Sequence, residues 1–156
     1  MATQQGDVSL LQDPVAQELL QSRVPAQLGY SWLDDTPRVV PIWFHWTGEE
    51  VVMGSPLKAP KLKALPRRPT VAVSIDSDTW PYRVLQIRGA AHVQTVEGGT
   101  TPEYEAAATR YFGEEQGRAW VEQVRNTFTH MARIAIRPRW VAILDFETRF
   151  PSALSR

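Results

Sequence analysis

The residues with the clearest chemical character lie in a short basic segment near the middle of the chain. Between Lys58 and Arg68 five cations fall within eleven residues, and residues 51–75 contain no acid. The segment follows a predicted β-strand that ends near Ser55, and it includes a short predicted helix. The serine hydroxyl, the helix N-terminus and the lysine ammonium groups could therefore converge on a phosphate. A solvated basic surface is the alternative, and the residues alone leave both interpretations open.

Aromatic residues elsewhere in the chain could complete a site for a planar ring. The chain has six tryptophans, two of them within residues 41–46 and another within residues 80–82. Alternate residues of a strand face the core, so these aromatic residues are first of all core and turn residues. An aromatic wall beside a phosphate site is nevertheless what a planar ring cofactor requires.

The common catalytic and cofactor motifs are absent. The sequence has no G-x-G-x-x-G after a strand, no P-loop, no G-x-S-x-G elbow and no H-E-x-x-H. It has no cysteine, which excludes disulfides, thiolate nucleophiles and iron–sulfur clusters. His45, His92 and His130 lie on different predicted elements, and single histidines are more often hydrogen-bonded residues than ligands. We therefore expect no metal site.

The charge balance narrows the possible partners. Lys+Arg and Asp+Glu both number 17, so the formal net charge is zero. Nothing global indicates a nucleic-acid or membrane surface. The N-terminal residues lack a basic region followed by an apolar run, and no stretch approaches the ~20 apolar residues of a membrane span. We expect a cytoplasmic protein that binds neither nucleic acid nor membrane.

Hydrophobic periodicity predicts short strands with helices at the start, in the middle and near the end of the chain. Asp13 followed by Pro14 is a helix start signal, and Gly89 indicates a bulge within a long strand. Helices are predicted over residues 13–21, 100–111 and 114–128, with a turn or two of helix within 56–69. Strands are predicted over residues 26–33, 38–46, 50–54, 70–76, 82–96, 131–137 and 140–146, the last two joined by a turn at residues 137–139.

This element order predicts a mainly β, α+β fold. Six or seven antiparallel strands with short flanking helices suggest a small closed or split β-barrel. Residues 26–54 are interpreted as an antiparallel meander. No repeat, linker or composition change divides the chain, so residues 1–156 are expected to form one domain.

Several segments, in this order and spacing, resemble the pyridoxamine 5'-phosphate oxidase-like superfamily of flavin-binding split β-barrels. The similarity is strongest to its flavin/deazaflavin oxidoreductase branch. The segments that carry the resemblance are TPRVVPIWF (residues 36–44), a Thr-Gly turn (47–48), VVMGS (51–55), KLKAL (61–65), PTVAVSI (69–75) and residues 84–91. The resemblance implies an FMN-binding split barrel that spans residues 1–156.

The resemblance also implies a homodimer with two equivalent cofactor sites at its interface. The cofactor ring would lie against the strand that contains Pro41, Ile42 and Trp43. Arg83 matches an arginine that approaches the cofactor from the partner subunit.

The phosphate would be held after the next strand. On the family pattern of a hydroxyl residue followed six positions later by lysine, Ser55 and Lys61 fall on phosphate-binding positions. Lys58 lies close to a basic position of many members and is expected to be an additional contact.

The departures from the family bear on the activity. Pyridoxamine phosphate oxidases carry a lysine on the strand represented here by Trp43 and Phe44, together with an Arg/His-rich C-terminal segment, and this chain has neither. Oxidation of vitamin B6 is therefore not expected. The expected function is hydride transfer between F-420, or FMN, and a small unsaturated organic substrate, with no residue identified as acid or base. The alternative is a non-catalytic flavin- or haem-binding storage or sensor protein.

Overall fold

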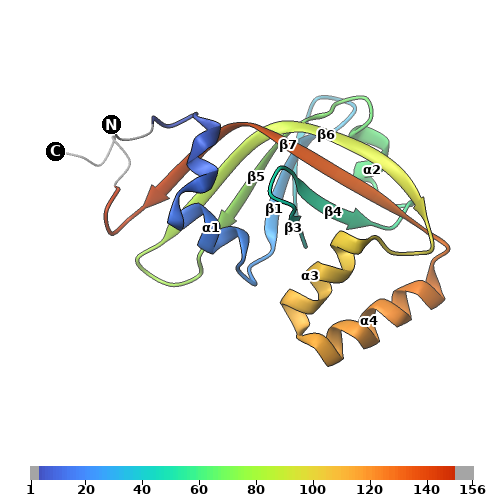
Figure 1. The fold of residues 1–156 in the computed structure, drawn as a ribbon. Coiled ribbons are helices and arrows are strands. Elements are labelled where there is room, and N and C mark those ends of the chain that lie inside the picture. The colour runs from blue at the N-terminus through green and yellow to red at the C-terminus, as the bar shows by residue number, and fades with distance from the viewer. Residues whose placement is uncertain (1–3, 150–156) are drawn as a thin grey trace.

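The computed structural model describes residues 4–149. Its seven strands form one curved antiparallel sheet in the order β2-β1-β5-β6-β7-β4-β3, flanked by short helices (Figure 1). The strands are β1 (Ala26–Ser31), β2 (Pro37–Ile42), β3 (His45–Trp46), β4 (Val51–Ser55), β5 (Thr70–Asp76), β6 (Arg83–Glu97) and β7 (His130–Asp145). The helices are a 3₁₀ helix (Val8–Gln12), α1 (Pro14–Leu20), α2 (Lys61–Ala64), α3 (Pro102–Phe112) and α4 (Glu114–Thr127). This arrangement confirms the predicted antiparallel split barrel, which is open between the edge strands β2 and β3.

Local signals explain where two of the helices begin. The Asp13 carboxylate accepts a hydrogen bond from the Val15 amide at 2.9 Å, and Pro14 occupies the first turn of α1. The Thr101 hydroxyl accepts from the Tyr104 amide at 3.1 Å at the start of α3. Each cap satisfies an amide that the helix itself leaves without an acceptor, and the start at Asp13 and Pro14 agrees with the sequence prediction.

The bulge predicted at Gly89 is confirmed, but the predicted turn at residues 137–139 is wrong. The two expected strands form one continuous strand, β7, which pairs with β6 along its whole length. Gly89 faces Pro138 and Arg88 faces Trp140, so Arg139 is the extra residue of a bulge. A proline lacks the amide that a regular ladder needs, and a bulge is where a central strand tolerates one.

The predicted strand over residues 38–46 is divided. It forms β2 and β3, which lie at opposite edges of the sheet, so the expected meander consists of two separate hairpins. Trp43 and Phe44 connect the hairpins, and Phe44 is fully buried. The apolar pattern continues through the connection because its side chains are packed, and it therefore conceals the end of the strand.

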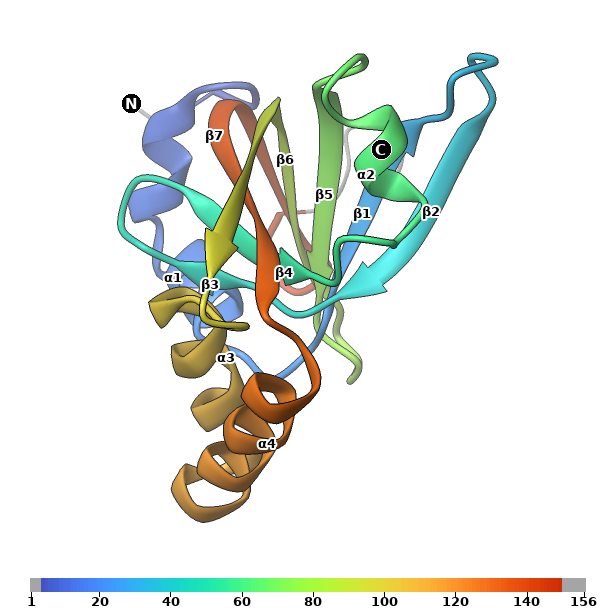
Figure 2. The same cartoon turned by 90° about the vertical axis from the view of Figure 1, so that its right-hand side faces the viewer.

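The core lies inside the curve of the sheet, and helices cover its ends. Its largest fully buried side chains include Leu28, Phe44, Met53, Ile75, Ile87, Ile134 and Ile143. The 3₁₀ helix packs on β7 and α1 packs on β6, whereas α3 packs on β3, β4 and α4. Figure 2 shows α3 and α4 together at one end of the barrel and α2 at the side of β1 and β2.

Gly89→Ala should destabilise the fold, because an added Cβ would overlap the Arg137 carbonyl oxygen across the bulge. Overpacking of this kind costs about 1–3 kcal/mol. Gly29→Ala is the matched control, since its Cβ would meet its nearest atom at an ordinary 3.6 Å. Urea denaturation should show a loss of stability in the first variant and a change within about 0.5 kcal/mol in the second. Equal stabilities would contradict the assignment of the bulge.

Candidate functional site

The cations of the basic segment lie in different environments. Arg68 belongs to the scaffold, because its Nε donates to the Trp32 carbonyl at 3.1 Å and its Nη2 donates to the Leu33 carbonyl at 2.9 Å. The same guanidinium pairs with Asp35 at 3.0 Å. Arg68 therefore ties the end of the segment to the loop between β1 and β2 and is not available to a ligand.

Among the cations of this segment that form no ion pair with a described residue, Lys61 is the one that is partly buried. Its side chain is half-buried, and burial lowers the pKa of its ammonium. Within residues 4–149 no carboxylate forms an ion pair with it. Lys63, two residues along, is exposed. A half-buried charge without a counter-ion is unfavourable, because burial removes part of the water that stabilises it. A bound anion at Lys61 would replace that lost stabilisation.

Ser55 ends β4, six residues before Lys61. Ser55 is 1% exposed, and its hydroxyl donates one long hydrogen bond of 3.4 Å to the Pro56 carbonyl. The hydroxyl is thus weakly bonded but covered by the chain. Lys58 is exposed on the connection between β4 and α2. The predicted phosphate contacts of these two residues remain predictions.

The end of β2 and the α2 segment contact the same core. Pro41 is exposed, whereas Ile42 and Leu62, the residue after Lys61, both pack against the buried cluster. Both side chains thus contribute to the hydrophobic core, which extends through the whole barrel.

The Trp43 ring lies in an aromatic cluster. It stacks on Tyr111 with ring centroids 4.9 Å apart and an interplanar angle of 14°, and it meets the edge of Phe112 at 4.8 Å. The cluster consists of Trp43, Tyr104, Tyr111, Phe112 and Trp120. It fills the space between the β2–β3 connection and the hairpin of α3 and α4.

Arg110 fixes this cluster to the barrel. Its Nε donates to the Ser22 carbonyl at 2.9 Å and its Nη2 donates to the Phe44 carbonyl. The guanidinium also lies 4.8 Å from the ring centroids of Phe44 and Tyr111. Burial raises the pKa of the Tyr111 hydroxyl, which keeps that group neutral. No sequence motif indicated Arg110, because its partners are 66 and 88 residues away.

A second polar contact holds the start of α3. Glu103 accepts from Arg133 of β7 at 2.7 Å, and both side chains are largely buried. Burial alone would raise the pKa of Glu103, but the hydrogen bonds from Arg133 and the attraction of its charge lower it overall. The other Glu103 oxygen, Oε2, is buried with no hydrogen-bond partner among the described residues.

Burial and the positive charge of Arg110 lower the pKa of His45, on β3.

Arg83 lies far from Ser55 within one chain. It pairs with Glu18 and, at 3.9 Å, with Glu147. Ser55 faces Ala132, which in turn faces Thr95 of β6. Arg83 and Thr95 are 12 residues apart on β6, or roughly 40 Å of strand. Arg83 therefore cannot join Ser55 in the same subunit.

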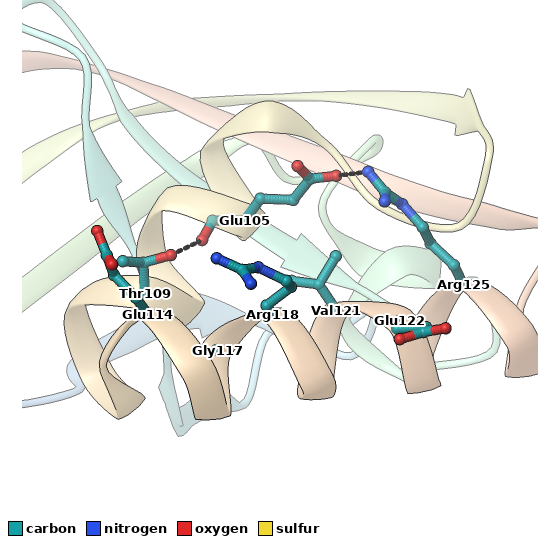
Figure 3. A pocket seen from close by; sticks show the side chains of 8 residues that line it. All are labelled: Glu105, Thr109, Glu114, Gly117, Arg118, Val121, Glu122 and Arg125. Atoms are coloured by element: carbon teal, nitrogen blue, oxygen red, sulfur yellow. Dashed lines mark hydrogen bonds and ion pairs between the residues drawn. The ribbon is translucent and has the colours of Figure 1, made fainter.

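A polar groove of about 470 Å³ runs between α3 and α4 (Figure 3). Glu105 and Arg125 form an ion pair across it, and the Thr109 hydroxyl donates to the Glu105 carbonyl at 3.2 Å. Three acids and two arginines line the groove. Its negative balance does not suit an anionic cofactor.

No group of three or more histidine, aspartate or glutamate side chains within residues 4–149 could hold a metal ion. In the same residues, no helix is both long and apolar enough to cross a membrane.

The fold is similar to several solved structures. An F420 reductase is 26% identical, over 80% of this chain and 93% of that chain, with a TM-score of 0.62. A candidate pyridoxamine 5'-phosphate oxidase from Listeria innocua is 23% identical, over 86% and 98% of the two chains, with a TM-score of 0.58. An FAD and heme binding protein from Mycobacterium smegmatis is 19% identical, over 94% and 75%, with a TM-score of 0.62.

No protein-family model matches the sequence, and no curated protein matches it either. The structural similarities nevertheless agree with one another. The chain has the split-barrel fold of the pyridoxamine 5'-phosphate oxidase-like superfamily.

Proposed function

We propose that this chain is an oxidoreductase that transfers a hydride between F-420, or FMN, and a small unsaturated organic substrate. The observation that carries the proposal is the half-buried Lys61 ammonium, which has no carboxylate partner among the described residues. A phosphate of the cofactor would supply the missing anion. The similarity to an F420 reductase favours a deazaflavin or flavin over other phosphorylated ligands.

The residues of this chain would bind and orient the cofactor. Lys61 would donate a charge-assisted hydrogen bond to the phosphate, with Lys58 and Ser55 as further contacts. Pro41 and Ile42 would support the ring from β2, and Trp43 would hold that strand against α3. The bound ring supplies the hydride chemistry, and the protein positions it and excludes water.

A homodimer would complete this site. Arg83 would approach a cofactor held near Ser55 from a second copy, since Ser55 pairs with the far end of β6 in its own subunit. The outer face of the sheet offers a surface for such a copy, because Val39, Gly29, Ala72 and Arg88 form one row across four strands. Val39 is 71% exposed, which is unusual for a large apolar side chain on a sheet.

The second candidate function is a storage or sensor protein that binds flavin or haem without turnover. It is favoured by the similarity to the FAD and heme binding protein. A turnover assay with reduced cofactor separates the two, since a storage protein would bind the cofactor and oxidise nothing. In either case we propose a cytoplasmic location and no nucleic-acid or membrane partner.

Lys61→Ala should weaken cofactor binding by roughly ten-fold or more, because a charge-assisted bond of about 1.5–3 kcal/mol is lost. Lys63→Ala is the matched control, since Lys63 is exposed in the same four-residue helix. Fluorescence titration with FMN and F-420 measures both variants. The salt dependence should also flatten in Lys61→Ala, because screened attraction is removed. Equal losses in the two variants, or no loss in either, would refute the assignment of Lys61.

Light scattering of the purified protein should give twice the chain mass of 17.6 kDa. Val39→Arg should shift the protein toward monomer, because it places a charge on the proposed interface. Val8→Arg, at another exposed valine, should leave the mass unchanged. A wild-type monomer that binds cofactor fully would rule out the interface site.

A further inference from the structure

An apolar cavity of about 330 Å³ lies between α4 and the paired strands β4 and β7. Its volume is at the lower end of the roughly 300–1,000 Å³ of small-molecule sites. No residue that lines it is acidic. The apolar walls come from Gly54, Tyr104, Trp120, Val124, Phe128 and Met131.

Contacts between the lining residues hold the walls in place. The Trp120 indole Nε1 donates to the Tyr104 hydroxyl at 2.9 Å, which joins α4 to α3. The Trp43 ring lies against both of these rings, at centroid distances of 6.0 and 6.3 Å. At Gly54 an added Cβ would come within 2.6 Å of both Met131 and Tyr104, so glycine lets these side chains approach β4. The cavity is therefore preformed by a rigid aromatic wall.

A second cavity beside the first adds a cation to an otherwise mostly apolar lining. This adjoining cavity of about 370 Å³ shares Pro56, Thr127, Phe128 and His130 with the first and adds Leu57, Lys58 and Thr129. Lys58 is exposed and forms no ion pair with any described residue. No acidic residue lines this second cavity either. A positive charge with no counter-ion thus stands at the entrance of an apolar space.

We propose that these two cavities together bind a small amphiphilic monoanion, a carboxylic acid with an unbranched or aromatic apolar body. The body would occupy the space between Tyr104, Trp120 and Met131, where burial of apolar surface stabilises it. The carboxylate would lie at the mouth and accept a hydrogen bond from Lys58.

This site is separate from the anion site at Lys61. Successive residues of a strand face opposite sides of the sheet, so the cavity at Gly54 lies on the other side of β4 from the Ser55 side chain. Lys58 is also a proposed contact of the cofactor phosphate, so decanoate and the cofactor would compete for it, and the titrations below use protein without cofactor. Lys61→Ala, which tests the cofactor site, should leave binding to this cavity unchanged.

Isothermal titration of the full chain with decanoate tests the proposal. Thr127→Trp places a large side chain in both cavities from an exposed position and should abolish binding. Asn126→Trp is the matched control, because Asn126 is exposed on α4 and lines neither cavity. Its affinity should equal that of the wild type. No binding of decanoate to the wild type, or unchanged binding in Thr127→Trp, would overturn the proposal.

The role of the charge needs a second comparison. Lys58→Gln should weaken decanoate binding about ten-fold and change the affinity for decanol less than about two-fold. Lys63→Gln, at a lysine that lines neither cavity, should change neither affinity. Two results would contradict the proposal that Lys58 binds a carboxylate head group. One is equal affinity of the wild type for decanoate and decanol, and the other is a Lys58→Gln variant that binds decanoate as tightly as the wild type does.

Discussion

The crossing of the chain from β2 to β3 is the constraint on which the rest of the structure depends. These strands form opposite edges of the sheet, so Trp43 and Phe44 must span the open side of the barrel without a ladder of hydrogen bonds. Arg110 replaces part of the missing backbone bonding, because it donates a hydrogen bond to the Phe44 carbonyl and packs on the Phe44 ring. The Trp43 ring then provides the surface on which α3 and α4 rest. The crossing therefore keeps the barrel split and positions the helices.

Lys61 and Lys58 differ in how far the protein removes their charges from water. Lys61 loses hydration through burial, and no described carboxylate replaces it, so an anion there gains from a partly desolvated charge. Lys58 keeps its hydration and has electrostatic influence mainly at the mouth of an apolar cavity. The two lysines are only three residues apart, on the connection after β4 and at the start of α2. On the two proposals, the same basic segment would bind a cofactor phosphate on one side and a second ligand on the other.

The sequence predicted the elements whose signals are local and missed the contacts that depend on distant residues. Gly89 indicated its bulge correctly, because a glycine inside a long strand often marks a bulge or a close approach of the backbone. Pro138 was interpreted as a turn, since nothing local reveals that it faces that bulge. The family resemblance assigned Lys61 to phosphate binding, which stays a prediction. The partners of Arg110 and the packing of Trp43 on α3 are set by tertiary structure alone.

The central claim is that this chain holds a flavin or deazaflavin through its phosphate. FMN and riboflavin share one ring and differ only in that phosphate, so titration of the wild-type protein with FMN, riboflavin and F-420 side by side tests the claim most directly. The account predicts saturable binding of FMN or F-420 that weakens with salt, and much weaker binding of riboflavin. Binding of none of the three, or equal affinity for FMN and riboflavin, would contradict it.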